Sequence, residues 1–218
     1  MPRRAGKVVV AAGTNGAGKS SIAAELATAG HLEFFNPDAY AARLVAAGKT
    51  QAEANAIAWR FGYDALRTAV DKRGQFGFET TLGGDSIVRE LHRAIDLGLE
   101  VHVFYVGLCS PELHIARVKA RVARGGHDIP EAKIRERYGK SVANLVGLLG
   151  RATSVHVFDN SDETSDGVPC ARLVFRMTRM RIDEPDPETL LREAPEWAKP
   201  LAAAALKVTA RKAGRRGR

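Results

Sequence analysis

The 218-residue chain has few cysteines and no long apolar run, and each absence excludes a class of protein. Its two cysteines, Cys109 and Cys170, match neither a CxxC nor a Cys/His spacing. We therefore expect thiols in a reducing cytoplasm, not a disulfide or a metal pair. No apolar run approaches the roughly 20 residues that span a bilayer, and the run at 8–12 is shorter than the roughly 7–15 apolar residues of a signal peptide. We expect a cytoplasmic protein with no membrane segment.

Acidic residues are missing from the C-terminal end, and this explains the net charge of +8. Six of the 33 basic residues lie in residues 207–218, which contain no acid, so the rest of the chain has 27 basic and 25 acidic residues. Such a segment is typical of a solvated, disordered tail, and a weak contact with nucleic acid is the functional alternative. No aromatic residues interleave with these basic ones. We therefore expect a nearly neutral body over residues 1–206 and a basic tail.

Strand-like apolar runs alternate with helical patterns along the body. The expected strands are 8–12, 32–35, 76–81, 101–108 and 155–158, with 171–178 as an edge strand. Helix start signals lie between them, such as the capping box of Thr50 and Glu53 and the sequence Ser110-Pro111-Glu112. Strands separated by helices favour a parallel sheet that is covered on both faces. The sequence predicts one α/β domain with an inserted lid.

Residues 13–20 have the sequence GTNGAGKS, which matches the P-loop pattern at every fixed position. They lie between an expected strand and an expected helix, as a P-loop does. In such a loop, backbone N–H groups turn inward around phosphate oxygens at a helix N-terminus. Lys19 would reach the β- and γ-phosphates, and Ser20 would bind Mg²⁺. The residues expected to bind a nucleoside triphosphate are Gly13, Thr14, Asn15, Gly16, Ala17, Gly18, Lys19, Ser20 and Ser21.

Acidic residues lie at the end of, or just after, three of the expected strands, whose C-terminal ends face the ligand crevice in an open α/β sheet. Asp38 could take the proton from an acceptor hydroxyl during phosphoryl transfer, or could only cap the next helix. Glu79 and Thr80 could orient a Mg²⁺-bound water or hold a polar substrate, or could face solvent. Asp159 follows an apolar run, as the acid of a Walker B strand does, and is a rival ligand for the metal. Spacing leaves these alternatives open.

Arg117, Arg121 and Arg124 recur at spacings of four and three, so we expect them on one face of a helix. This helix has no acid after its first turn, and Gly125-Gly126 follows it. A solvated charged face is one explanation. In a P-loop protein, clustered arginines beside a Gly-Gly pair also favour a lid, over about residues 110–150, that clamps phosphates and stabilises charge in the transition state.

Several segments of the body agree in order and combination with one family. They are GTNGAGKSS at 13–21, FFNPDAYA at 34–41, FETTLGG at 78–84, GLCSPELHIARVKARVARGGHDIP at 107–130, IRERYGKSVANL at 134–145 and VHVFDNS at 155–161. Together they resemble the zeta-toxin family of P-loop kinases, in particular its compact, chromosomally encoded bacterial members. The resemblance implies an adenylate-kinase-like fold with a helical lid and ATP-dependent phosphorylation of a sugar nucleotide. In the best-understood members, the acceptor is the 3′-hydroxyl of the amino sugar in UDP-N-acetylglucosamine.

The resemblance also implies ATP and Mg²⁺ as cofactors and roles for individual residues. Lys19 handles the phosphates, and Asp38 is the base. Arginines of the lid stabilise the transferring phosphoryl group. The residues implied for the lid are Arg121, Arg124 and Arg117, the last as a nucleotide contact; those implied for the substrate side are Asp38, Glu79, Thr80 and His127. The loop of Asp159, Asn160 and Ser161 would lie near adenine, with Asn160 as a nucleotide contact, which argues against Asp159 as the metal ligand. The family further implies an antitoxin partner, although no residue of this chain identifies one.

Two other hypotheses stay open. One is a kinase for a different hydroxyl, such as that of a nucleoside or a polynucleotide 5′-end, which the basic segment 207–218 favours. The other is a nucleotide-binding ATPase without a phosphoryl acceptor. Against the ATPase, the sequence contains an arginine-rich helix typical of a lid and no LSGGQ signature.

Overall fold

The computed structural model describes residues 6–30 and 32–216, in which seven strands form one sheet in the order β2-β3-β1-β4-β5-β6-β7. The first five strands in sequence are parallel, and β6 and β7 are antiparallel. Their bounds are β1 (Lys7–Ala12), β2 (Phe34–Phe35), β3 (Gln75–Thr80), β4 (Glu100–Gly107), β5 (Ser154–Asp159), β6 (Arg172–Thr178) and β7 (Arg181–Glu184). The predicted α/β fold with a parallel sheet is confirmed. The strand expected at an edge, β6, instead has a neighbour on each side, and β7 forms that edge.

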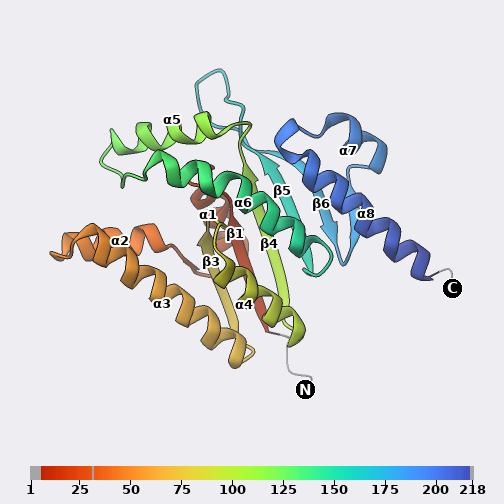
Figure 1. Ribbon diagram of the computed structural model, residues 1–218, viewed down its shortest axis with the longest axis horizontal. Coiled ribbons are helices and arrows are strands. Elements are labelled where there is room, and N and C mark those ends of the chain that lie inside the picture. Colours follow the sequence, from red (N-terminus) through yellow and green to blue (C-terminus); the bar gives the residue numbers. More distant parts are fainter. Residues whose placement is uncertain (1–5, 31, 217–218) are drawn as a thin grey trace.

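Helices cover both faces of the sheet: α1 lies behind it, and α4, α6 and α8 lie in front of it (Figure 1). The helices α2 and α3 form a pair beyond β3, and α5 and α6 form a second pair above the sheet (Figure 1). Their bounds are α1 (Lys19–Gly30), α2 (Pro37–Ala46), α3 (Gln51–Asp71), α4 (Asp85–Asp96), α5 (Pro111–Val122), α6 (Glu131–Leu149), α7 (Pro187–Glu193) and α8 (Lys199–Arg216), with a 3₁₀ turn at Glu196–Ala198.

The central strands are apolar on both faces because helices bury both faces. Successive side chains of a strand point to opposite sides. In β1, Val8 and Val10 belong to the large front core, together with Leu145 of α6. In β4, Val106 belongs to the smaller core on the other face, where it packs with Ile22 of α1. The unbroken apolar run at the start of the chain is therefore what a parallel strand buried on both sides requires.

The C-terminal end of the chain is helical, which corrects the expectation of a disordered tail for residues 207–216. The physical reason lies in the apolar residues of α8. Leu201 and Ala205 are fully buried, and Val208 packs against the same core. These apolar contacts with the core stabilise the helix despite its basic composition. The Lys212 ammonium also donates a hydrogen bond to the carbonyl oxygen of Arg179. Residues 217 and 218 of the expected tail lie outside the described residues.

Two further sequence predictions concern the cysteines and membrane-spanning segments. Cys109 and Cys170 are both free and exposed, as expected of residues that form no disulfide with each other. Among the helices in the described part of the chain, none combines the length and the apolar character that a membrane span needs.

Candidate active site

The P-loop joins β1 to α1 and has the backbone of a phosphate cradle. Gly16 and Gly18 have φ angles of 83° and 98°, which glycine adopts at little cost. A Cβ atom at Gly16 would lie 2.8 Å from the His114 carbonyl oxygen, and one at Gly18 would lie 2.6 Å from the Asn160 amide nitrogen. Glycine is therefore required both for the turn and for the close approach of two neighbouring segments.

Side chains from α5 and from the end of β5 support the loop. His114 Nδ1 lies 2.8 Å from the Asn15 carbonyl oxygen, and Asn160 Nδ2 donates to the Ala17 carbonyl oxygen at 2.9 Å. Arg117 in turn donates to the Asn160 carbonyl oxygen at 2.7 Å. Burial lowers the pKa of His114 to about 4, so its ring is neutral at about pH 7 and Nδ1–H is the donor. Sequence reasoning missed His114 because nothing in its local pattern distinguishes it.

Three polar side chains meet where α1 begins and where β2 and β3 end. Ser20 Oγ donates to Glu79 Oε2 at 2.9 Å, and Asn36 Nδ2 donates to Glu79 Oε1 at 2.7 Å. Burial raises the pKa of Glu79. Burial disfavours the charged form of Lys19 as well, and this lowers the pKa of the ammonium. The negative charges of Asp38 and Glu79 oppose that shift. The Ser20 hydroxyl and the Glu79 carboxylate thus lie side by side, and both offer oxygen atoms of the kind that coordinate Mg²⁺.

Asp38 lies in the first turn of α2 but does not cap it. Asn36 Oδ1 accepts the hydrogen bond from the Ala39 N–H at 3.0 Å, with Pro37 at the first helical position. The alternative in which Asp38 is only a helix cap is therefore wrong. The Asp38 carboxylate is half-exposed, and its Oδ2 lies 3.7 Å from a guanidinium nitrogen of Arg121.

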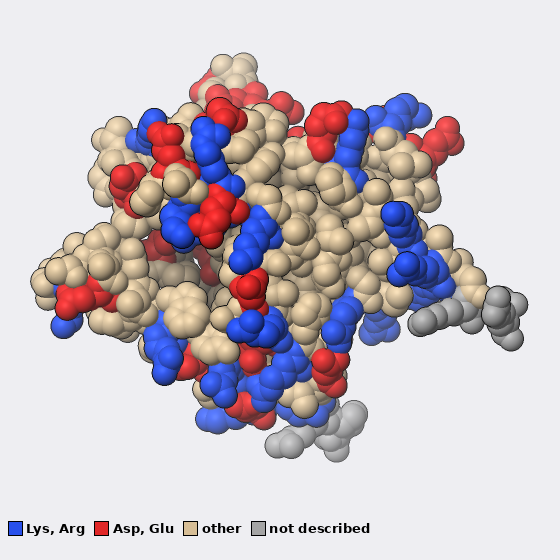
Figure 2. All heavy atoms as spheres, viewed as in Figure 1, with Lys and Arg blue, Asp and Glu red and all other residues tan. Residues whose placement is uncertain are grey.

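A cavity of about 390 Å³ separates the α2–α3 pair from the α5–α6 side of the molecule, within the usual size range of ligand pockets. Lys19, Asp38 and Glu79 all line it. Trp59 and Tyr63 line it from α3, and their rings stack with centroids 5.2 Å apart. Figure 2 shows this hollow with acidic side chains inside it. The cavity thus joins the P-loop to an aromatic wall.

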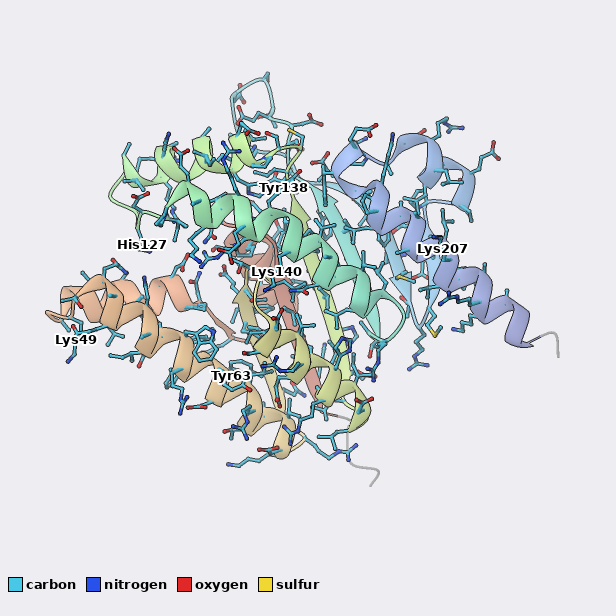
Figure 3. All side chains as sticks on the ribbon, in the orientation of Figure 1. Lys49, Tyr63, His127, Tyr138, Lys140 and Lys207 are labelled. Atoms are coloured by element: carbon cyan, nitrogen blue, oxygen red, sulfur yellow. The ribbon has the colours of Figure 1, made fainter. Side chains whose placement is uncertain are left out.

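The expected lid residues separate into two groups. Arg121 donates to the His127 carbonyl oxygen at 2.7 Å, and His127 lines the cavity from the turn between α5 and α6, across from Tyr63 on α3 (Figure 3). Arg124 lies outside α5, because the helix ends at Val122. It is exposed, and its Nε donates to the Ala120 carbonyl oxygen at 3.1 Å. The three arginines therefore do not share one helical face.

The remaining candidate residues also have defined places. Thr80 lines the cavity, and its Oγ1 accepts a hydrogen bond from the Leu82 N–H at 3.0 Å. Ser21 is exposed on α1. Asp159 Oδ1 accepts from the Ser161 N–H at 3.1 Å and so serves its own turn. The acid in contact with Ser20 is Glu79, on the strand beside β1, and not Asp159.

Arg137 and Asn36 are site residues that sequence reasoning did not select. Arg137 lines the cavity from α6 and donates to Asn15 Oδ1 at 2.8 Å, across 122 positions of the chain. A contact between such distant residues leaves no trace in local spacing. Asn36 does have a local signal, since Pro37 marks the first helical position and Asn is a preferred N-cap.

Comparisons with known proteins identify the family of the chain. The family model for zeta toxin matches residues 1–166. The chain belongs to the zeta toxin family. An uncharacterized protein of Haemophilus influenzae is 32% identical to this chain over 132 residues, which are 61% of this chain and 92% of the relative. The resemblance of the sequence motifs to the zeta-toxin family is confirmed at the level of the family.

Solved structures agree on the fold. The chromosomal PezAT toxin-antitoxin system of Streptococcus pneumoniae has a chain with a TM-score of 0.55 and 14% identity, over 78% of this chain and 71% of that one. A chain in the AvrRxo1-ORF1:AvrRxo1-ORF2 structure with sulphate ions has a TM-score of 0.61 and 16% identity, over 87% of this chain and 64% of that one. At these identities the likeness shows the fold alone. This chain spans less than two thirds of the AvrRxo1 chain.

Proposed function

We propose that this zeta toxin family member is a kinase that transfers the γ-phosphoryl group of ATP to a hydroxyl of a sugar nucleotide. Family membership supports the reaction class, ATP-dependent transfer to a hydroxyl. The observation that carries the proposal is the cavity itself. It brings Lys19 of the P-loop to the same space as the carboxylates of Asp38 and Glu79 and the aromatic wall of α3.

The donor side fits a nucleoside triphosphate with Mg²⁺. Within the described residues, Thr14 Oγ1 in the loop and Asn160 Oδ1 beside it are buried without a hydrogen-bond partner. Both oxygens can accept a hydrogen bond from a ligand, and the Thr14 hydroxyl can also donate one. A structure of the AvrRxo1 complex contains ATP, which supports the same nucleotide here. Ser20 and Glu79 would hold Mg²⁺, directly or through water, and the metal would supply positive charge that neutralises the phosphates.

The acceptor side supplies a base and cations. Asp38 is free of capping and lines the cavity, so its carboxylate can accept the proton of an acceptor hydroxyl placed within hydrogen-bond reach. Arg121, which pairs with Asp38 at 3.7 Å, would bind the transferring phosphoryl group when substrates fill the site. Glu79, Thr80 and His127 would contact the acceptor from the cavity wall.

The cavity wall supports a sugar nucleotide as the acceptor. The stacked rings of Trp59 and Tyr63 offer a flat apolar surface to a base or sugar ring. Lys133 and Arg137 line the same cavity and can bind phosphate oxygens. UDP-N-acetylglucosamine has all of these groups, and we propose the 3′-hydroxyl of its amino sugar as the acceptor. By the likeness to the PezAT system, we also propose that the chain acts with an antitoxin protein.

The test is incubation with Mg²⁺, ATP labelled at the γ-phosphate, and a panel of sugar nucleotides, nucleosides and 5′-hydroxyl oligonucleotides. We expect label on UDP-N-acetylglucosamine, and no transfer by Lys19→Ala, which removes the phosphate-binding ammonium. Label on a nucleoside or an oligonucleotide would overturn the choice of acceptor. Release of labelled inorganic phosphate alone would overturn the kinase function.

A further inference from the structure

Asn36 follows β2 directly, and both ends of its side-chain amide are used. Its Oδ1 accepts a hydrogen bond from the Ala39 N–H at 3.0 Å and so caps α2. Its Nδ2 donates to Glu79 Oε1 at 2.7 Å and to Ser20 Oγ at 3.3 Å. An amide has one accepting end and one donating end, and only this orientation suits an N–H on one side and a carboxylate on the other. One side chain therefore joins the first turn of α2 to the pair of Ser20 and Glu79.

The register of the sheet places Asn36 beside Glu79. β2 pairs with β3 in parallel, with Phe35 opposite Phe78, and Asn36 and Glu79 are the next residues along the two segments. Glu79 is 7% exposed, and each of its carboxylate oxygens accepts a hydrogen bond, Oε2 from Ser20 and Oε1 from Asn36. Because the carboxylate is held at both oxygens, the contact with Asn36 helps to fix its orientation beside Ser20.

The same residue holds the start of α2, where Asp38 lies. The α2–α3 pair lies beyond β3 (Figure 1), and β2, which leads into it, has two residues. Few backbone hydrogen bonds of the sheet therefore hold the beginning of α2. Asn36 adds a contact at this point, because the side chain that caps the helix also binds β3 through Glu79. A short route of one side chain and two residues thus connects Glu79 to Asp38, and all three residues line the cavity.

We propose that Asn36 is a positioning residue for both the metal side and the acceptor side of the site. It holds the Glu79 carboxylate beside Ser20, where the two would bind Mg²⁺, and through the helix cap it holds Asp38 in place relative to Glu79. This rests on the proposed kinase function. Groups that orient a metal ligand without touching the metal typically contribute about 10- to 100-fold to metal affinity or activity.

The test compares Asn36→Ser with Asn36→Ala, and Thr50→Ala is the control. Serine is a preferred N-cap, so Asn36→Ser keeps the cap of α2, but its shorter side chain has no amide N–H to donate to Glu79. Asn36→Ala removes both contacts. Thr50 caps α3 by accepting a hydrogen bond from the Glu53 N–H and does not line the cavity, so Thr50→Ala removes a cap and leaves the site intact.

Calorimetric titration with ATP, in Mg²⁺ and in EDTA, measures how much the metal strengthens nucleotide binding and needs no acceptor. We expect Asn36→Ser to weaken ATP binding about tenfold in Mg²⁺ and less than about twofold in EDTA, because it disturbs the metal ligand alone. Thr50→Ala should lower the melting temperature by about 2–4 °C, as the loss of a cap does, and should bind ATP as wild type does in both solutions.

The acceptor side is tested by kcat, with the molecule of the panel that takes the label. Asn36→Ala should have a kcat about tenfold below that of Asn36→Ser, because it also releases the start of α2 and so misplaces Asp38. If Asn36→Ala does not fold, Asn36→Gly takes its place, since glycine also lacks the amide but is tolerated at an N-cap.

Unchanged ATP binding by Asn36→Ser in Mg²⁺, or equal weakening in Mg²⁺ and in EDTA, would overturn the role of Asn36 at the metal side. Equal kcat values for Asn36→Ser and Asn36→Ala would overturn its role toward Asp38. A weaker effect of Mg²⁺ in Thr50→Ala would show that any lost cap acts in this way, and would overturn the proposal as well. Failure of the proposed function appears separately, as a wild-type chain that labels no acceptor, whereas the titrations report on Asn36 in either case.

Discussion

The two sides of the cavity are built differently. The P-loop side comes from one contiguous stretch, residues 13–20, in which Thr14 and Asn15 are buried and the backbone is held by neighbouring side chains. The acceptor side is assembled from α2, α3, β3 and the α5–α6 turn, and its Asp38 and Trp59 side chains remain half-exposed. A local motif therefore sets the donor chemistry, whereas the choice of acceptor depends on residues that only the fold brings together.

The strongest way to separate the two sides is Asp38→Asn. We expect it to lower phosphoryl transfer about 10²- to 10⁴-fold, because the amide cannot accept the hydroxyl proton. ATP affinity and melting temperature should stay near wild type, since Asn36 and not Asp38 caps α2. Asp64→Asn is the matched control, because Asp64 lies exposed on α3 in a surface pair with Arg60. Undiminished transfer by Asp38→Asn would remove this carboxylate from the mechanism.

Trp59→Ala tests the aromatic wall alone. Loss of a stacking surface is worth roughly 1–3 kcal/mol, so we expect the KM for the acceptor to rise about tenfold or more. The KM for ATP should change less than about twofold, because Trp59 lies on the acceptor side. The control is Ile57→Ala, a change at a 40%-exposed residue two positions away that does not line this cavity. Equal increases in both KM values would show that the two sides are not separable.

His114 gives the smallest effect on activity and a clear effect on stability. Burial lowers the pKa of His114 to about 4, against a usual 6.5. Between about pH 4 and pH 6.5, the unfolded state therefore binds a proton at this residue more readily than the folded state does. The stability that neutral His114 contributes is present above about pH 6.5 and is lost as the pH falls through about 4, by roughly 3 kcal/mol in all. His114→Gln keeps an N–H donor for Asn15 without titrating. Urea unfolding at about pH 7 and pH 4.5 should show a smaller pH dependence in the variant; an equal dependence would contradict the pKa.

Sequence reasoning succeeded where the signal is local. The P-loop and the alternation of strands and helices depend on neighbouring residues, and both were predicted. Arg137 and Trp59 could not be predicted, because each reaches the site only through the packing of its helix. The prediction that Arg124 lies on the same helix as Arg117 and Arg121 was wrong, because α5 ends at Val122, before the Gly-Gly pair. The prediction of disorder for residues 207–216 was wrong. It relied on their basic composition and did not consider the apolar residues of α8 that pack into the core.

The most direct test of the central claim, that the two sides of one cavity exchange a phosphoryl group, is the stoichiometry of the reaction. Wild-type protein is incubated with UDP-N-acetylglucosamine, Mg²⁺ and ATP labelled at the γ-phosphate, and ADP and labelled products are counted. We predict one labelled sugar nucleotide for each ADP formed, and neither product with Lys19→Ala. Formation of ADP together with labelled inorganic phosphate, and no labelled acceptor from any member of the panel, would contradict it.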